Sequence, residues 1–282
     1  CNENFVLKRI QNTKLLLDKE QNKNIFICMF AELSIISNFT FLTGASHPEE
    51  YMMRAALLGL PAIAITDVNS VTGIVRAYSA ARDIKRFVKD RQSKNSIGPP
   101  RPQNIKKPPS LSLDTIPRLI PGSKFKLIDG FEITVLPKSR KGWGTLCRCL
   151  SKGRLRNSKG LCDLVISEIS EELDDVVLLI HSPKIPWNLK KSKLWLKNST
   201  LLKNKFNQDV YIVLTPEYDG IDHKRFEHTK KLSKTIRCDL VASAHPIMHH
   251  SKRRKLADVL TAIRLGKSVD QLGKNALPNA ER

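Results

Sequence analysis

The sequence contains no run of about 18 apolar residues, so it offers no candidate for a membrane-spanning helix. Residues 1–28 are polar and lysine-rich, and they lack the apolar core that a secretory signal peptide needs. The six cysteines do not have zinc-ribbon spacing, since the closest pair, Cys147 and Cys149, is separated by a single residue. We therefore expect reduced thiols in a cytoplasmic protein without a membrane partner.

Acidic residues are also scarce, with 27 Asp and Glu against 48 Lys and Arg, which gives a net charge of +21. Such an excess attracts nucleic-acid phosphates or another anionic surface. A lysine-rich solvated surface is an equally open interpretation, because the charge is spread along the whole chain. With 41% hydrophobic residues, the 282-residue chain can bury a core, either as one α/β barrel or as two small domains.

The most informative stretch is residues 31–76. Ser46 is followed three residues later by Glu49, which is the pattern of a capping box, and Pro48 lies in the first predicted turn. These signals predict a helix over Glu49–Leu58 with apolar residues at helical spacing.

Two apolar runs flank this helix. Leu33–Ile36 predicts a short strand, and Pro61–Thr66 is an unbroken apolar and β-branched run that is typical of a strand buried on both faces. Asp67 follows the second strand, and Ser70 is placed to open another helix. This alternation predicts an α/β fold with functional residues at the carboxyl ends of strands.

The rest of the chain continues the alternation. An Asp129–Gly130 turn between two apolar runs predicts a hairpin. Further strands are predicted at 176–180, 210–214 and 240–243, and helices at 71–90, 139–150, 188–204, 226–236 and 255–265. About six or seven strand–helix pairs result. Five prolines and several lysines in residues 92–115 predict a surface insertion there.

Three segments within residues 31–76 resemble the start of the PHP domain (polymerase and histidinol phosphatase) of bacterial C-family DNA polymerases, most closely the error-prone branch. These segments are SNFTFLTGASHPEE, AIAITDVNS and GIVRA. The resemblance continues through residues 130–160 and returns at 239–282. It implies a distorted (βα)7-type PHP barrel at the amino terminus of a DNA-directed DNA polymerase (a nucleotidyltransferase) that acts in DNA replication and repair past DNA damage.

The resemblance also implies domain boundaries. Residues 29–270 would form the PHP domain, with 92–115 as an insertion, and 271–282 would begin the linker to a polymerase core that this sequence lacks. Residues 1–28 do not resemble the family, so we expect an extension that is not native, with a genuine basic arm as the alternative. The catalytic aspartates that hold magnesium in the polymerase core cannot be assigned here, so we expect this chain alone to be inactive in polymerisation.

Active members of the family hold two or three divalent metals with His and carboxylate ligands at strand ends. The corresponding positions here are Ser34 and Ile36 on the first strand, Asp67 and Val68 after the second, Pro121–Ser123, and His245 and Ile247 after the last. Only Asp67 and His245 can ligate a metal, so the resemblance implies a degenerate site, and we expect no cofactor in this chain. Asp67 is predicted to cap the following helix, and His245 to be a hydrogen-bonded structural histidine.

Three functional hypotheses remain open at this stage. The first is a structural platform within an error-prone polymerase, with DNA, the rest of the polymerase chain and other replication or repair proteins as partners. The second is a phosphoesterase or proofreading nuclease whose metal site is rebuilt from His181, His249, His250 or Asp163. The third is a freestanding basic nucleic-acid-binding protein. The candidate DNA contacts are Lys152, Arg154, Arg156, Lys252, Arg253 and Arg254.

Overall fold

Three parallel strands form the first sheet of the computed structural model, which describes residues 30–94, 113, 116–183 and 189–276. They are β1 (Glu32–Ile35), β2 (Ala62–Ile65) and β3 (Arg118–Pro121), in that order. Helices α2 (Pro48–Leu57) and α3 (Thr72–Lys94) connect the strands, and their apolar residues pack on the outer face of the sheet. The strand β2 is therefore buried on both faces, as its unbroken apolar sequence predicts.

The second sheet has five strands. In order they are β4 (Ser123–Lys126), β5 (Glu132–Pro137), β6 (Val176–His181), β7 (Val210–Leu214) and β8 (Asp239–Ala242). The pairs β4–β5 and β5–β6 are antiparallel, whereas β6, β7 and β8 run parallel. The predicted hairpin is confirmed, since Gly130 takes a positive φ of 81° in the turn and Asp129 accepts a hydrogen bond from the Phe131 amide.

One apolar cluster lies between the two sheets and joins them into a barrel. It draws residues from every strand except β4: Leu33, Ala64, Ile120, Leu136, Val177, Leu179, Tyr211, Val213 and Val241. A second, larger cluster fills the space between the five-stranded sheet and the helices outside it. The two sheets thus share an interior while both outer faces are covered, and the expected distorted α/β barrel is confirmed.

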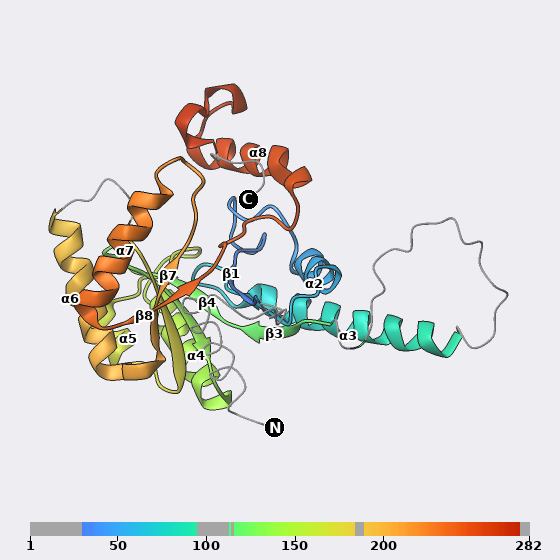
Figure 1. The fold of residues 1–282 in the computed structure, drawn as a ribbon, viewed down its shortest axis with the longest axis horizontal. Helices are drawn as coiled ribbons and strands as arrows, with labels where there is room; N and C mark the ends of the chain where they lie inside the picture. Colours follow the sequence, from blue (N-terminus) through green and yellow to red (C-terminus); the bar gives the residue numbers. More distant parts are fainter. Residues whose placement is uncertain (1–29, 95–112, 114–115, 184–188, 277–282) are drawn as a thin grey trace, which may run out of the picture.

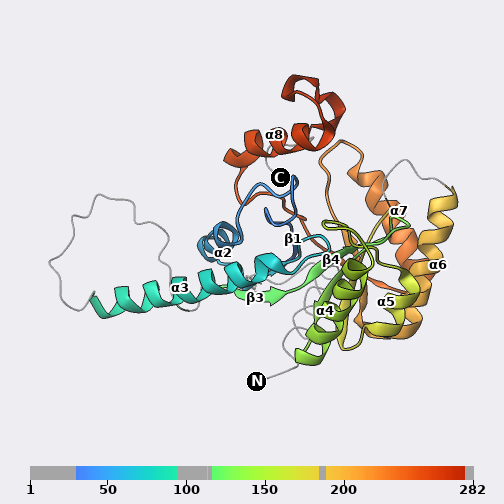
Figure 2. The same cartoon turned by 180° about the vertical axis from the view of Figure 1, so that it is seen from behind.

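Figure 1 shows how the helices surround these sheets. The helices α4 (Arg140–Leu155), α5 (Ile166–Glu172), α6 (Leu189–Phe206) and α7 (Asp222–Ile236) gather on the five-stranded sheet, and α3 extends away on the opposite side in both views (Figure 2). The helix α8 (Arg254–Leu265) follows β8 in the chain and lies apart from the helices that cover the five-stranded sheet. Short 3-10 turns occur at Asn207–Asp209, Ser251–Arg253, Val269–Gln271 and Gly273–Asn275. Among the described residues, no helix is long and apolar enough to cross a membrane.

The barrel closes through backbone contacts rather than through one continuous sheet. On one side, a parallel bridge pairs Val68, just after β2, with Lys124 in β4. On the other side, the segment that follows β8 runs beside the end of β1. There, the Ile36 amide donates to the Pro246 carbonyl at 3.0 Å and the Ala45 amide donates to the Ile247 carbonyl at 2.7 Å. The carboxyl ends of β1, β2 and β8 are therefore brought together.

The capping box of α2 is one residue later than predicted. His47, not Ser46, is the N-cap, and Glu50, not Glu49, returns the bond to the backbone of His47 at 2.9 Å. The physical reason is that Pro48 occupies the first helical position, which makes the residue before it the cap. Ser46 instead accepts a hydrogen bond from the His249 amide at 3.0 Å.

The structure also bears on the predicted segment boundaries. The helix α3 continues to Lys94, so residues 92–94 of the predicted insertion are helical rather than loop. The rest of the predicted insertion, apart from residues 113 and 116 onward, and all of residues 1–28 lie outside the described residues. Leu272, placed in the predicted linker, is buried next to α8, so the packed domain reaches at least to that residue.

Candidate functional site

Polar side chains gather inside the barrel where β1, β6 and β8 end. Six of them, called here the mouth cluster, are Ser34, Lys124, Glu132, Thr134, His181 and His245. Ser34 Oγ lies 2.9 Å from His245 Nδ1, and Lys124 Nζ lies 3.3 Å from His245 Nε2. Lys124 Nζ also lies 2.8 Å from a carboxylate oxygen of Glu132. These contacts form a continuous polar chain from β1 across to β5.

Two further members complete the mouth cluster. Thr134 Oγ1 lies 2.8 Å from His181 Nε2, and the rings of His181 and His245 have centroids 5.5 Å apart with an edge-to-face arrangement. Glu132, Thr134 and the core residue Leu136 alternate along β5 and so share its inward face. The structure thus brings together His181 and His245, two candidates that the sequence placed 64 residues apart.

The contacts of His245 fix its tautomer. Its Nδ1 lies 3.0 Å from the backbone carbonyl oxygen of Ser34, which can only accept a hydrogen bond. The ring proton is therefore on Nδ1, and Nε2 presents its lone pair to the Lys124 ammonium. His245 also has a positive φ of 48°, an uncommon backbone conformation for a residue other than glycine. Both ring nitrogens are engaged, as the prediction of a structural histidine requires.

Asp67 does not cap α3, which corrects the prediction. Its carboxylate accepts hydrogen bonds from the Ser37 amide at 2.8 Å, the Ser37 hydroxyl at 2.7 Å and the Thr40 hydroxyl at 2.8 Å. All three donors belong to the loop that follows β1, whereas the Ser70 hydroxyl accepts from the Thr72 amide at the start of α3. Burial raises the pKa of the Asp67 carboxyl, and the bonds from Ser37 and Thr40 oppose that rise.

The remaining positions that correspond to metal ligands are apolar or lie elsewhere. Ile36 is buried and Val68 and Ile247 carry no donor atom. Among the side chains considered as substitute metal ligands, Asp163 lies outside the mouth cluster. It lines a cavity together with Val68 and Asn69. His249 lies against Ser46, with Nδ1 to Oγ at 2.8 Å, and His250 accepts through Nδ1 from the Lys252 amide at 3.1 Å.

These donors do not fit a cluster of two or three divalent metals. Both oxygens of Asp67 are committed to the loop after β1, and the Nε2 of His245 faces an ammonium group at 3.3 Å. A cation that occupies the ligating nitrogen is incompatible with a metal ion at the same atom. Within the part of the chain that the structure describes, no group of three or more His, Cys, Asp or Glu side chains is arranged to hold a metal.

Comparison with known proteins identifies the fold. The sequence profile of the PHP domain matches residues 32–220, which is more than half of the chain. The chain belongs to the PHP domain family. The chain is 37% identical over 267 residues to an error-prone DNA polymerase of Ruegeria pomeroyi, covering 90% of this chain and 23% of that protein. An error-prone DNA polymerase of Rhodopseudomonas palustris is 32% identical, with 90% and 20% covered.

The chain thus spans about a fifth of the length of the curated relatives that it matches. Among solved structures, an amidohydrolase from Chromobacterium violaceum, determined with bound sulfate and no metal, aligns with a TM-score of 0.48 at 12% identity and covers 77% of this chain and 87% of that one. A similarity of this size carries no argument about the chemistry of this PHP domain.

Two of the candidate DNA contacts pair with acidic residues of α5. Lys152 pairs with Glu172, and Arg156 forms two bonds with Glu168, at 2.9 and 2.8 Å. Because α4 ends at Leu155, Lys152 lies on this helix, which extends beyond the end predicted at residue 150. A phosphate group would have to compete with these carboxylates, so DNA contact at these residues stays a prediction.

The second group of candidate DNA contacts, Lys252, Arg253 and Arg254, also includes residues that pair with carboxylates. Arg253 pairs with Glu50 of α2, and Arg254 pairs with Asp258 one helical turn later, at 2.9 Å. Lys252 is exposed, and its side chain forms no ion pair with a described residue. In this group only Lys252 offers an uncompensated charge to an external anion.

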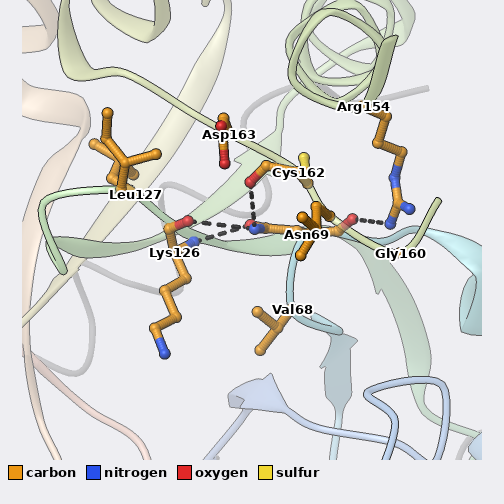
Figure 3. Close-up of a pocket in the computed structure, with 10 residues that line it drawn as sticks. Val68, Asn69, Lys126, Leu127, Arg154, Gly160, Cys162 and Asp163 are labelled. Atoms are coloured by element: carbon orange, nitrogen blue, oxygen red, sulfur yellow. Dashed lines mark hydrogen bonds between the residues drawn. The ribbon is translucent and has the colours of Figure 1, made fainter. Parts of the chain in front are cut away.

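Arg154 has a structural contact that the sequence did not indicate. Its guanidinium donates to the carbonyl oxygen of Asn69, which has a positive φ of 48° (Figure 3). The Asn69 side chain accepts from the Lys126 amide at 2.9 Å and donates to the Cys162 carbonyl at 3.5 Å. Asn69 therefore ties the loop after β2 to β4 and to the segment after α4, at the edge of a cavity of about 350 Å³.

Sequence reasoning missed two charged members of the mouth cluster, Lys124 and Glu132, and also Glu32, whose carboxylate accepts from the Ser34 and Ala244 amides. Glu32 and Lys124 are buried, and Glu132 has a side chain that is 24% exposed. Each stands next to apolar residues on a short strand, in β1, β4 or β5. A charged residue at a buried strand position costs free energy unless it is paired, so each could have been recognised as one member of a pair or network. The partners could not have been named, because they come from distant strands.

Proposed function

We propose that this chain is the amino-terminal PHP domain of an error-prone DNA polymerase, and that it acts there as a metal-free structural platform for the polymerase core. The observation that carries the proposal is the mouth cluster, in which an ammonium and hydrogen-bonded side chains occupy the strand ends where the family's metal ligands would be. The names and lengths of the relatives support the rest, because a protein four to five times longer has room for a core outside the matched part.

An exposed apolar surface offers a place for such a core to dock. Leu256, Val259 and Ile263 lie on α8 at helical spacing and are 39, 40 and 58% exposed. Phe41, 83% exposed, lies in the loop after β1, which Arg264 joins to α8 through a 3.1 Å bond to Thr43. Apolar side chains clustered on a surface mark an interaction site. We name these four residues the α8 surface and assign the polymerase core as its partner.

Charged substitutions on the α8 surface are expected to weaken the full-length polymerase. Val259→Glu combined with Ile263→Glu would place two carboxylates in an apolar interface, which costs several kcal/mol if the interface forms. We expect a lower midpoint of thermal unfolding and at least a tenfold loss of primer extension. Val75→Glu, an equally polar change on exposed α3, is the matched control. Deletion of residues 29–282 with full retention of folding and activity would contradict the platform role.

The metal-free state is tested by elemental analysis of the purified chain. We expect zinc, manganese and iron well below one atom per chain, and no turnover of a phosphodiester, because the Nε2 of His245 faces Lys124. A His245→Ala variant should leave both results unchanged. A metal near stoichiometry, together with phosphodiesterase turnover that His245→Ala abolishes, would instead support the phosphoesterase hypothesis.

The proposal further includes replication past DNA damage, contact with DNA and a cytoplasmic location. These parts follow from the relatives' names and from the basic composition of the chain. The freestanding nucleic-acid-binding alternative draws on the net charge of +21 alone.

A further inference from the structure

A second cavity, of about 380 Å³, opens between α2, the loop after β7 and the segment after β8. It is lined by Arg54, Leu58, Tyr218, Ala244, Pro246, Met248, His249, His250 and Ser251. Its volume lies within the range of small-molecule sites. None of the residues assigned above to the mouth cluster, the α8 surface or the candidate DNA contacts lines it, so it is a separate feature of the domain.

The lining of this cavity combines N–H-donating side chains with an absence of carboxylates. It holds one guanidinium and two imidazoles, and none of the lining residues is acidic. The Arg54 side chain makes no hydrogen bond or ion pair with any described residue. Glu50, the carboxylate 3.7 Å from His249 Nδ1, is already bound to Arg253 and to the His47 amide. The Arg54 guanidinium can therefore bind two oxygens of a phosphate group through two parallel bonds.

His250 supplies a second donor of known orientation in its ring. Its Nδ1 accepts from the Lys252 amide at 3.1 Å, and a backbone amide can only donate. The proton of the neutral ring is consequently on Nε2, which forms no hydrogen bond with a described residue. Arg54 and His250 thus present N–H donors from two different elements, while Pro246 and the buried Met248 supply apolar contacts.

Tyr218 contributes an aromatic ring to the cavity, and the backbone of this residue is strained. It is 50% exposed and has a φ of 57°, a conformation that is a genuine outlier for a bulky residue. The strain is stabilised by Asp222, whose carboxylate accepts from the Glu217 and Tyr218 amides at 2.9 Å each. Strained residues of this kind concentrate at binding sites. An exposed tyrosine ring is also a stacking surface for a nucleobase.

We propose that this cavity binds a nucleoside phosphate group, with Arg54 and His250 holding a terminal phosphate and the Tyr218 ring stacking on the base. The same chemistry occurs in a free nucleotide and in the phosphorylated end of a single strand. No bond is made or broken, so the site needs neither metal nor cofactor. The proposal is independent of the platform role, because none of its residues belongs to the α8 surface.

The test compares a short single-stranded DNA carrying a 5′-phosphate with the same strand carrying a 5′-hydroxyl, both labelled at the 3′ end. Binding is measured by fluorescence anisotropy at physiological salt, which suppresses non-specific phosphate contacts. We expect the phosphorylated strand to bind more tightly by about tenfold or more, the effect of one charge-assisted hydrogen-bond pair. Arg54→Gln should remove this preference, and Tyr218→Leu should weaken binding of both strands.

Arg82→Gln is the matched control, because it removes the same charge from an exposed position on α3. It should leave the preference for the 5′-phosphate unchanged, and circular dichroism shows whether each variant is folded. Competition by thymidine monophosphate, but not thymidine, would identify a free nucleotide as sufficient, whereas failure to compete would assign the strand end. Equal binding of the two strands, or equal losses for Arg54→Gln and Arg82→Gln, would overturn the proposal.

Discussion

Glu32→Ala is expected to lower the free energy of unfolding by about 3–4 kcal/mol. Glu32 is a buried carboxylate on β1 that accepts bonds from the Ser34 amide at 3.0 Å, the Ala244 amide at 2.8 Å and the Ser243 hydroxyl. It joins the first strand to the segment after the last one, where β1 and β8 are not paired as neighbouring strands. Alanine would leave the Ser34 and Ala244 amides and the Ser243 hydroxyl without this acceptor and create a cavity, and both effects destabilise the fold.

The measurement is urea unfolding followed by circular dichroism, with two controls. Glu227→Ala removes a carboxylate that is paired with Lys230 on the exposed face of α7, so it should cost far less than Glu32→Ala. Glu32→Gln keeps the size of the side chain and its amide oxygen, so it should cost less than Glu32→Ala. A loss for Glu32→Ala no larger than that of Glu227→Ala would show that Glu32 does not hold the barrel closed.

The pKa of Glu32 predicts how the free energy of unfolding changes with pH. Burial raises the pKa of the Glu32 carboxyl above 4.5, although bonds from Ser243, Ala244 and Ser34 oppose the rise. The folded state therefore binds the proton more tightly than the unfolded state. The resulting stabilisation is fully present below pH 4.5 and is lost as the pH rises through the folded pKa. Relative to Glu32→Gln, the wild-type protein should become less stable with increasing pH over that interval.

The outer structure of the barrel could be predicted because its signals are local. The apolar run of β2, the Asp129–Gly130 turn and the strand that ends at His181 depend on neighbouring residues, and all three lie where the sequence placed them. The capping box was displaced by one residue, because sequence spacing alone cannot decide between Ser46 and His47 as the N-cap when proline follows.

The site was harder to predict because its bonds join distant strands. A sequence pattern identified Asp67 and His245, but it could not show that Asp67 binds the loop after β1. The place of Lys124 next to Phe125 on a short strand indicates that it needs a partner, but nothing local identifies that partner, and His245 is 121 residues away. Only the fold shows that β4 carries an ammonium group into the barrel mouth, where it faces an imidazole and a carboxylate.

Lys124→Met is expected to lower the free energy of unfolding by about 2–3 kcal/mol. The Lys124 side chain is 9% exposed and pairs with Glu132 at 2.8 Å, so its removal leaves a poorly solvated carboxylate without this partner. Full burial of both groups would raise the cost to about 3–5 kcal/mol, but Glu132 is 24% exposed and partly solvated. Methionine keeps the length of the side chain and therefore limits any packing defect.

A double-mutant cycle separates the ion pair from other effects of the substitution. If Lys124 neutralises Glu132, the variant carrying both Lys124→Met and Glu132→Gln should be more stable than the sum of the single losses predicts, by about 1–2 kcal/mol. Chemical unfolding of the four proteins measures this coupling energy. Additive losses would mean that the ammonium does not stabilise Glu132. A positive coupling would show that an internal ion pair between Lys124 and Glu132 stabilises the mouth of the barrel.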